Sequence, residues 1–159
     1  MTVSIALSDK DVLRHDVSTS AGTTLSHRDL VSPWEEGVTS RTRADLEWAV
    51  ERQLFPLQEL PTGWDSYGAP AIDGRVVSLV VKFLVDVLAQ GLPKPWVVPT
   101  SLGGISLEWR RDQKELTVEW SPQRSLVDAF FSDDEAGYEW DLPFPAEGLF
   151  LPALASMER

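Results

Sequence analysis

The sequence predicts an α+β fold of two layers, in which one long helix and a shorter helix pack on a small antiparallel sheet. Three observations lead to it. Residues 73–90 would be apolar around most of the circumference of a helix, and they carry helical start and stop signals. After residue 96 apolar residues recur at every second position, which is typical of strands. The chain has 159 residues, 43% hydrophobic and 25% charged, which suits one globular domain.

The long helix is predicted over about 73–90 by its caps. Asp73 is a suitable N-cap, Gly91 follows the last periodic residue and Pro93 lies beyond it. Its polar residues step by three and four and form one narrow stripe: Arg75, Ser78, Lys82, Asp86 and Gln90. The rest is apolar, so we expect this helix to be buried on most of its circumference.

The shorter helix is predicted over "TRADLEWAVERQLF". Thr42 can cap its start, with Asp45 three positions on. Pro56 disfavours helical geometry at Phe55, so we expect the helix to end there.

The strands follow from alternation. "GGISLEWRRDQKELTVEWSP" predicts a β-hairpin, preceded by the brief extended run "WVVPT". Two more strands are expected around the acidic turn 132–137 in "SLVDAFFSDDEAGYEWDLP". Three tryptophans share strand faces with other apolar residues and are expected in the core: Trp109, Trp120 and Trp140.

Domain organisation is read from composition. Residues 1–40 form a poorly organised arm, with Val3, Ile5 and Leu7 suited to a short edge strand. Residues 41–142 form the single α+β domain, and 143–159 form an apolar tail. The tail is expected either to fold back over the core or to reach for a partner.

The charge restricts the class of partner. Twenty-five acids against fourteen bases give a net charge of −11, and no Lys or Arg lies between Ser125 and Glu158. Such a surface repels phosphates, so we expect no direct nucleic-acid binding. An acidic surface suits a basic protein partner, although acidity alone also serves solubility.

The sequence lacks the features of several other classes of protein. The chain has no cysteine, no P-loop, dinucleotide or serine-elbow motif, and no apolar run long enough to span a bilayer. The first residues lack the pattern of a secretory signal, so a cytoplasmic location is expected. The only histidines, His15 and His27, fall in the arm, and we expect no metal or cofactor.

The stretch "PTGWDSYGAPAI" poses the main question about a site. Asp65 beside Trp64 and Tyr67 could bind a sugar or a base. We favour a structural loop in which Asp65 bonds nearby amides, Gly68 supplies an unusual backbone angle, and the aromatic residues wedge the loop to the core.

Two acidic groups are further candidates. Glu108 and Glu119 point to the polar face of the hairpin and could act as paired carboxylates, but we favour a solvated polar face that has no chemical role. The run Asp133, Asp134 and Glu135 lacks the alternating ligands and central glycine of a calcium loop. A turn that resists edge-to-edge aggregation explains it.

The segment from Leu60 to about Leu142 resembles a recurrent group of small uncharacterised bacterial and phage-borne proteins. The matching residues are "LPTGWDSYGAP", "VVPTSLGGISLEW", "ELTVEW" and "FFSDDEAGYEW". The resemblance implies a common α+β module and no particular activity. Its framework residues would be Trp64, Asp65, Tyr67, Gly68, Gly103 and Gly104.

We therefore expect a non-enzymatic, acidic module that docks on a basic protein, of the antitoxin, immunity-protein or inhibitor type. The candidate partner-binding acids are Asp128, Asp133, Asp134, Glu135, Glu139 and Asp141. One alternative is a subunit of a larger assembly, with a homo-oligomer open. Another is a ligand binder or hydrolase with Asp65, Tyr67, Glu108 and Glu119 around one cavity.

Overall fold

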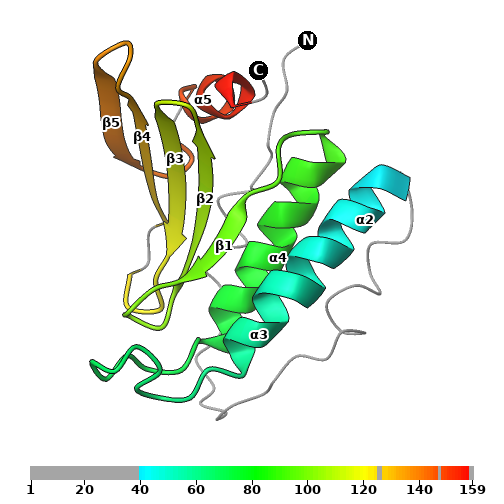
Figure 1. Ribbon diagram of the computed structural model, residues 1–159, viewed down its shortest axis with the longest axis vertical. Coiled ribbons are helices and arrows are strands. Elements are labelled where there is room, and N and C mark those ends of the chain that lie inside the picture. Colours follow the sequence, from blue (N-terminus) through cyan, green and yellow to red (C-terminus); the bar gives the residue numbers. More distant parts are fainter. Residues whose placement is uncertain (1–39, 125–126, 147, 158–159) are drawn as a thin grey trace.

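The computed structural model describes residues 40–124, 127–146 and 148–157 (Figure 1). The strand expected near the N-terminus and both histidines lie outside these residues. The described elements follow one another as α2 (Ser40–Ala49), η2 (Val50–Leu54, a π-helix), α3 (Phe55–Gln58), α4 (Gly74–Ala89), β1 (Trp96–Pro99), β2 (Ile105–Arg111), β3 (Lys114–Trp120), β4 (Asp128–Asp133), β5 (Tyr138–Pro143) and α5 (Phe150–Ser156). The predicted α+β class is confirmed.

Helix α4 begins and ends where the sequence predicts. The Asp73 carboxylate accepts a hydrogen bond from the Arg75 amide at 2.8 Å, and Gly91 just beyond the C-cap has a φ of 74°. The helix contacts β2 on one side and α2 on the other. Because it is covered from two sides, most of its circumference is buried, as the narrow polar stripe indicated.

The predicted end of the first helix is wrong. The chain stays helical from Ser40 through Gln58, with Pro56 inside α3. A π-helical turn immediately precedes it, in which the Phe55 amide donates to the Val50 carbonyl. This wider turn accommodates a proline that lacks an N–H and would clash with the preceding turn of a regular α-helix. Thr42 lies inside α2, so it is not the cap.

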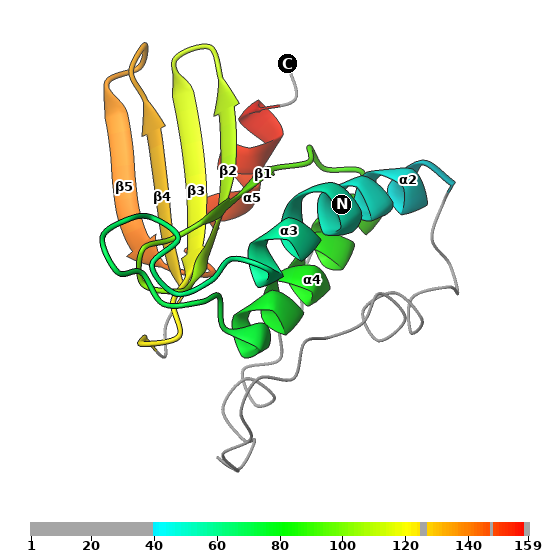
Figure 2. The same cartoon turned by 60° about the horizontal axis from the view of Figure 1, so that its bottom comes forward.

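The five strands form one antiparallel sheet in the order β1-β2-β3-β4-β5, as Figure 2 shows. The expected extended run at 96–100 joins as the edge strand β1. One register row crosses four strands with every side chain buried: Trp109, Leu116, Phe131 and Trp140. The alternation of the sequence therefore places the apolar side chains on one face of the sheet.

The tail folds back over the core as far as the structure describes it. Helix α5 buries Phe150, Ala153 and Leu154. The Phe150 ring centroid lies 5.9 Å from that of Phe83 on α4 and 6.4 Å from that of Trp109 on β2. The tail thus adds a helix to the apolar side of the sheet.

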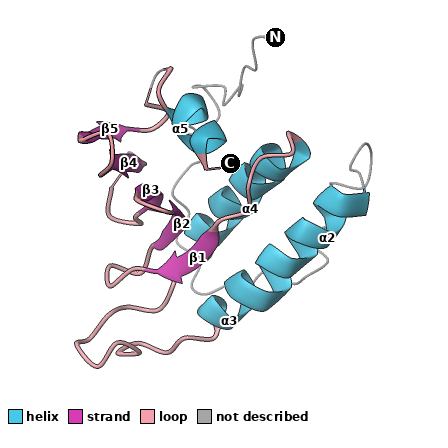
Figure 3. Ribbon diagram, turned by 45° about the horizontal axis from the view of Figure 1, so that its top comes forward, coloured by secondary structure: helices cyan, strands magenta, loops and turns pink. Residues whose placement is uncertain are grey.

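The described helices all lie on one side of the sheet (Figure 3). Helices α4 and α5 cover its apolar face, and α2 packs beside α4 near the β1 edge. The opposite face carries none of the described helices. None of the helices described is long and apolar enough to cross a bilayer.

Candidate interaction surface

The side of the sheet turned away from the helices is called the open face below. Successive side chains of a strand alternate between faces, so the residues between the buried ones point to it. It carries two aromatic residues, Trp96 and Phe130. Its carboxylates are Glu108, Glu115, Glu119, Asp128, Glu139 and Asp141. It is therefore a surface whose acids span four strands, β2 to β5.

Half of these carboxylates are paired within the chain. Arg110 Nη2 lies 3.2 Å from Glu108 Oε2 and 3.0 Å from Glu115 Oε1. The hydrogen bond to Glu115 and the charge of Glu108 raise the pKa of the Arg110 guanidinium. Asp128 forms an ion pair with Arg124. A cation on this face is thus already held between two acids.

The other three carboxylates, Glu119, Glu139 and Asp141, have no ion-pair partner among the described residues. Glu139 and Asp141 are exposed and Glu119 is partly exposed. They belong to β3 and β5, the two neighbours of β4. Uncompensated negative charge is therefore concentrated around the middle of β4.

The aromatic residues of the open face contact solvent. Phe130 is partly exposed, and Trp96 on the β1 edge is 62% exposed although its ring meets Trp48 of α2 edge to face at 5.9 Å. The β1 edge itself is protected, because the Gln53 side chain accepts a hydrogen bond from the Val97 amide at 2.9 Å.

The six acids predicted for partner binding fall into two groups. Asp128, Glu139 and Asp141 lie on the open face. Asp133 shares the opposite side of β4 with the buried residues, and its Oδ2 lies 3.5 Å from Lys114 Nζ. Asp134 and Glu135 are exposed in the β4–β5 turn. One contiguous surface of all six does not exist.

The loop between α3 and α4 is held by its own backbone. Asp65 Oδ1 accepts hydrogen bonds at 2.9 Å from the amides of Tyr67 and Ala69. The amides of Ala69 and Tyr67 hold the pKa of the Asp65 carboxyl below its ordinary value. Ser66 and Gly68 have positive φ values of 66° and 94°, which the tight loop requires. The carboxylate is thus used inside the loop.

The same loop is fixed to the β1–β2 turn. The Asp73 amide donates to the Gly103 carbonyl at 3.1 Å, and a Cβ added at Gly103 would lie 2.9 Å from Pro70 Cγ. The Trp64 indole donates to the Pro70 carbonyl at 3.3 Å. These contacts join the start of α4 to the sheet. Figure 3 shows the loop extending past β1 toward the side of the open face.

The expectation that both aromatic residues wedge this loop to the core is wrong for Tyr67. Its side chain is 95% exposed, whereas Trp64 is partly buried. The residue before it is held at positive φ, which turns the side chain outward. Tyr67 therefore adds nothing to the packing of the core.

The residues of the alternative ligand site are divided between the α3–α4 loop and the β2–β3 hairpin. Register pairs Glu108 with Thr117 and Glu119 with Ser106, so the two glutamates are diagonal neighbours on the open face. Asp65 is engaged in its own loop. Among the described residues, no group of three or more histidine, aspartate or glutamate side chains is placed to hold a metal ion.

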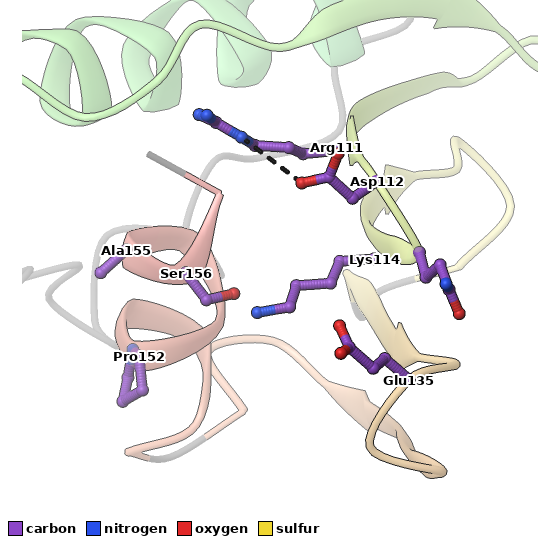
Figure 4. Close-up of a pocket in the computed structure, with 8 residues that line it drawn as sticks. Arg111, Asp112, Lys114, Glu135, Pro152, Ala155 and Ser156 are labelled. Atoms are coloured by element: carbon purple, nitrogen blue, oxygen red, sulfur yellow. Dashed lines mark ion pairs between the residues drawn. The ribbon is translucent and has the colours of Figure 1, made fainter. Parts of the chain in front are cut away.

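A cavity of about 460 Å³ lies between the β2–β3 turn, the β4–β5 turn and α5 (Figure 4). Its two cations are already engaged. Arg111 Nη1 donates to the Met157 carbonyl at the end of α5 at 3.1 Å, and Lys114 pairs with Asp133. Asp65, Tyr67, Glu108 and Glu119 do not line it. The cavity is a polar junction between α5 and the sheet.

Sequence reasoning missed Phe130 as part of the surface. A signal was present, because Phe130 and Phe131 are adjacent in one strand and must point to opposite faces. Comparison of the chain with protein-family models, with curated proteins and with solved structures found no match.

Proposed function

We propose that the protein is a non-catalytic acidic module of the cytoplasm that docks on a basic protein through the open face of its sheet. The type of function is that of antitoxins, immunity proteins and inhibitors, which act by covering a partner. The observation that carries the proposal is the open face, where Glu119, Glu139 and Asp141 lack ion-pair partners among the described residues and surround Phe130.

The chemistry of the surface favours a basic partner. Like charges on neighbouring residues of a sheet face repel one another, and this repulsion is relieved when cations are brought between them. A basic partner would supply those cations, and the overall charge of −11 would speed its approach. A partly exposed aromatic side chain at the centre adds apolar area for contact.

The same charges disfavour a homodimer through this face. Two copies meeting face to face would bring acids against acids, and juxtaposed like charges across an interface cost several kcal/mol. Among the strand residues that point to the open face, Arg110 is the single base, and it is already paired with Glu108 and Glu115. A partner of different composition fits better.

The test is a pull-down with three versions of the chain. The wild type is compared with Glu119→Gln/Asp141→Asn on the open face and with Asp134→Asn/Glu135→Gln in the β4–β5 turn. Both variants remove two negative charges from groups without an ion pair among the described residues. We expect basic proteins to be recovered by the wild type and the turn variant, and several-fold less by the open-face variant.

Because the two variants have the same net charge, equal losses in both would show attraction by overall charge alone and would contradict the proposal. Retention of the same partner by the open-face variant would also contradict it. Circular dichroism of each variant serves as the folding control.

A further inference from the structure

We infer that Phe130 and the three carboxylates around it form a seat for an arginine side chain of the partner. This inference deepens the proposed function and rests on it. It names the side chain that the open face would receive, where the proposal above requires only a basic protein.

The register places the groups of this seat. Phe130 on β4 lies directly opposite Asp141 on β5 and Thr117 on β3. Glu119 is the diagonal neighbour of Phe130 on β3, and Glu139 is its diagonal neighbour on β5. Opposite Cβ atoms are about 5 Å apart and diagonal residues about 7–8 Å apart, within reach of long side chains. Carboxylates therefore flank the ring from both neighbouring strands.

An occupant of this seat needs two properties. It must cover the apolar ring of Phe130, and it must bring positive charge to carboxylates at the rim. Lysine and arginine both combine an aliphatic stem with a cationic head. Only the guanidinium is planar, stacks on an aromatic face and offers donors in several directions at once. Arginine can contact the ring and two carboxylates together, whereas an ammonium is a single strongly hydrated point charge.

The open face already pairs guanidinium groups with its carboxylates. Arg110 bridges Glu108 and Glu115 from two adjacent strands, and Arg124 pairs with Asp128. The carboxylates next to Phe130 lie on β3 and β5, with β4 between them, and none of the three has an ion-pair partner among the described residues. Phe130 could instead be a β-forming residue that packs only on Thr117. Packing on Thr117 alone would leave the acids of β5, on the other side of Phe130, without a role.

The experiment measures binding of octa-arginine and octa-lysine to the folded chain by calorimetry in about 0.15 M salt, which screens distant charges. We expect octa-arginine to bind the wild type about fivefold more tightly than octa-lysine. The ratio should fall to about one in Phe130→Ala and remain in Tyr138→Ala, a matched control. Tyr138 is an aromatic residue of β5, 50% exposed, on the side of the sheet that faces the helices.

Nuclear magnetic resonance of the wild type avoids any question of folding. We expect octa-arginine to shift the Phe130 ring protons more than octa-lysine does. Equal affinity for the two peptides on the open face, with no shift of Phe130, would overturn this inference and leave the proposed function standing. Binding that the Glu119→Gln/Asp141→Asn variant retains, or no binding of either peptide, would count against the proposed function itself.

Discussion

Asp65 and Tyr67 lie two positions apart in the α3–α4 loop and have opposite surroundings. The Asp65 carboxylate accepts two backbone amides of the loop, whereas the Tyr67 side chain is 95% exposed. The aspartate therefore organises the loop, and the tyrosine is presented by it. Composition alone does not separate these two roles, because both residues are common in ligand-binding loops.

The role of Asp65 predicts a pH dependence. Its pKa is lowered in the folded state, so the folded state binds fewer protons than the unfolded state near the ordinary pKa of 3.8. The stabilisation by the carboxylate is fully present above that pKa and is lost as the pH falls through the lower pKa of the folded protein. We expect Asp65→Ala to lower the free energy of unfolding at neutral pH, and this deficit to shrink in acid.

Urea unfolding of both proteins across that range measures the deficit. Asp134→Ala is the matched control, since Asp134 is an exposed acid in a turn and its side chain makes no hydrogen bond to the described residues. A deficit for Asp65→Ala that does not change with pH would show that the two amide bonds are not what stabilises the loop.

At the scale of the element, helix α4 could be predicted and the α2–η2–α3 segment could not. The ends of α4 depend on local chemistry at Asp73 and Gly91, which the sequence displays. The continuation through Pro56 depends on a π-helical turn, and its Val50 and Leu54 are buried in the core. Tertiary packing outweighs the local preference there, and a single sequence does not show it.

Of the two glycines in the β1–β2 turn, Gly104 lies closer to neighbouring atoms. A Cβ at this position would lie 2.1 Å from the Trp120 carbonyl oxygen, at the point where β2 meets β3. Gly137, in the β4–β5 turn, has a positive φ of 64° but open space around it. We expect Gly104→Ala to lower the free energy of unfolding by about 3 kcal/mol or more, because backbone must shift.

We expect Gly137→Ala to lower the free energy of unfolding by only about 1 kcal/mol, the cost of holding a residue with a side chain at positive φ. Thermal and urea unfolding of the two variants gives the comparison. Equal costs would mean that β2 and β3 separate easily at Gly104, and that the turn is looser than the contacts indicate.

At the scale of the molecule, the buried face of the sheet was predictable and the composition of the open face was not. Alternation identifies the inward side chains such as Trp109 and Trp120 within each strand. Which outward residues become neighbours depends on the register between strands. Glu119 and Asp141 come to flank Phe130 only after β3, β4 and β5 pair.

The candidate site, too, could be predicted from the sequence only in part. Asp128, Glu139 and Asp141 could be selected from the acid-only stretch, because a long run without bases is visible in the sequence. Asp133 could not be separated from them, since its pairing with Lys114 is a contact between strands. The acids form a surface because every described helix lies on the other side of the sheet.

The most direct measurement is carboxyl footprinting of the chain, free and bound to the basic protein that the wild type recovers. Water-soluble carbodiimide couples an added amine to accessible carboxylates as an amide and leaves as its urea, and mass spectrometry reads the label at each carboxylate. We expect Glu119, Glu139 and Asp141 to lose labelling in the complex while Asp134 and Glu135 keep it. Protection of the turn acids with the open face still fully labelled would contradict the proposed function.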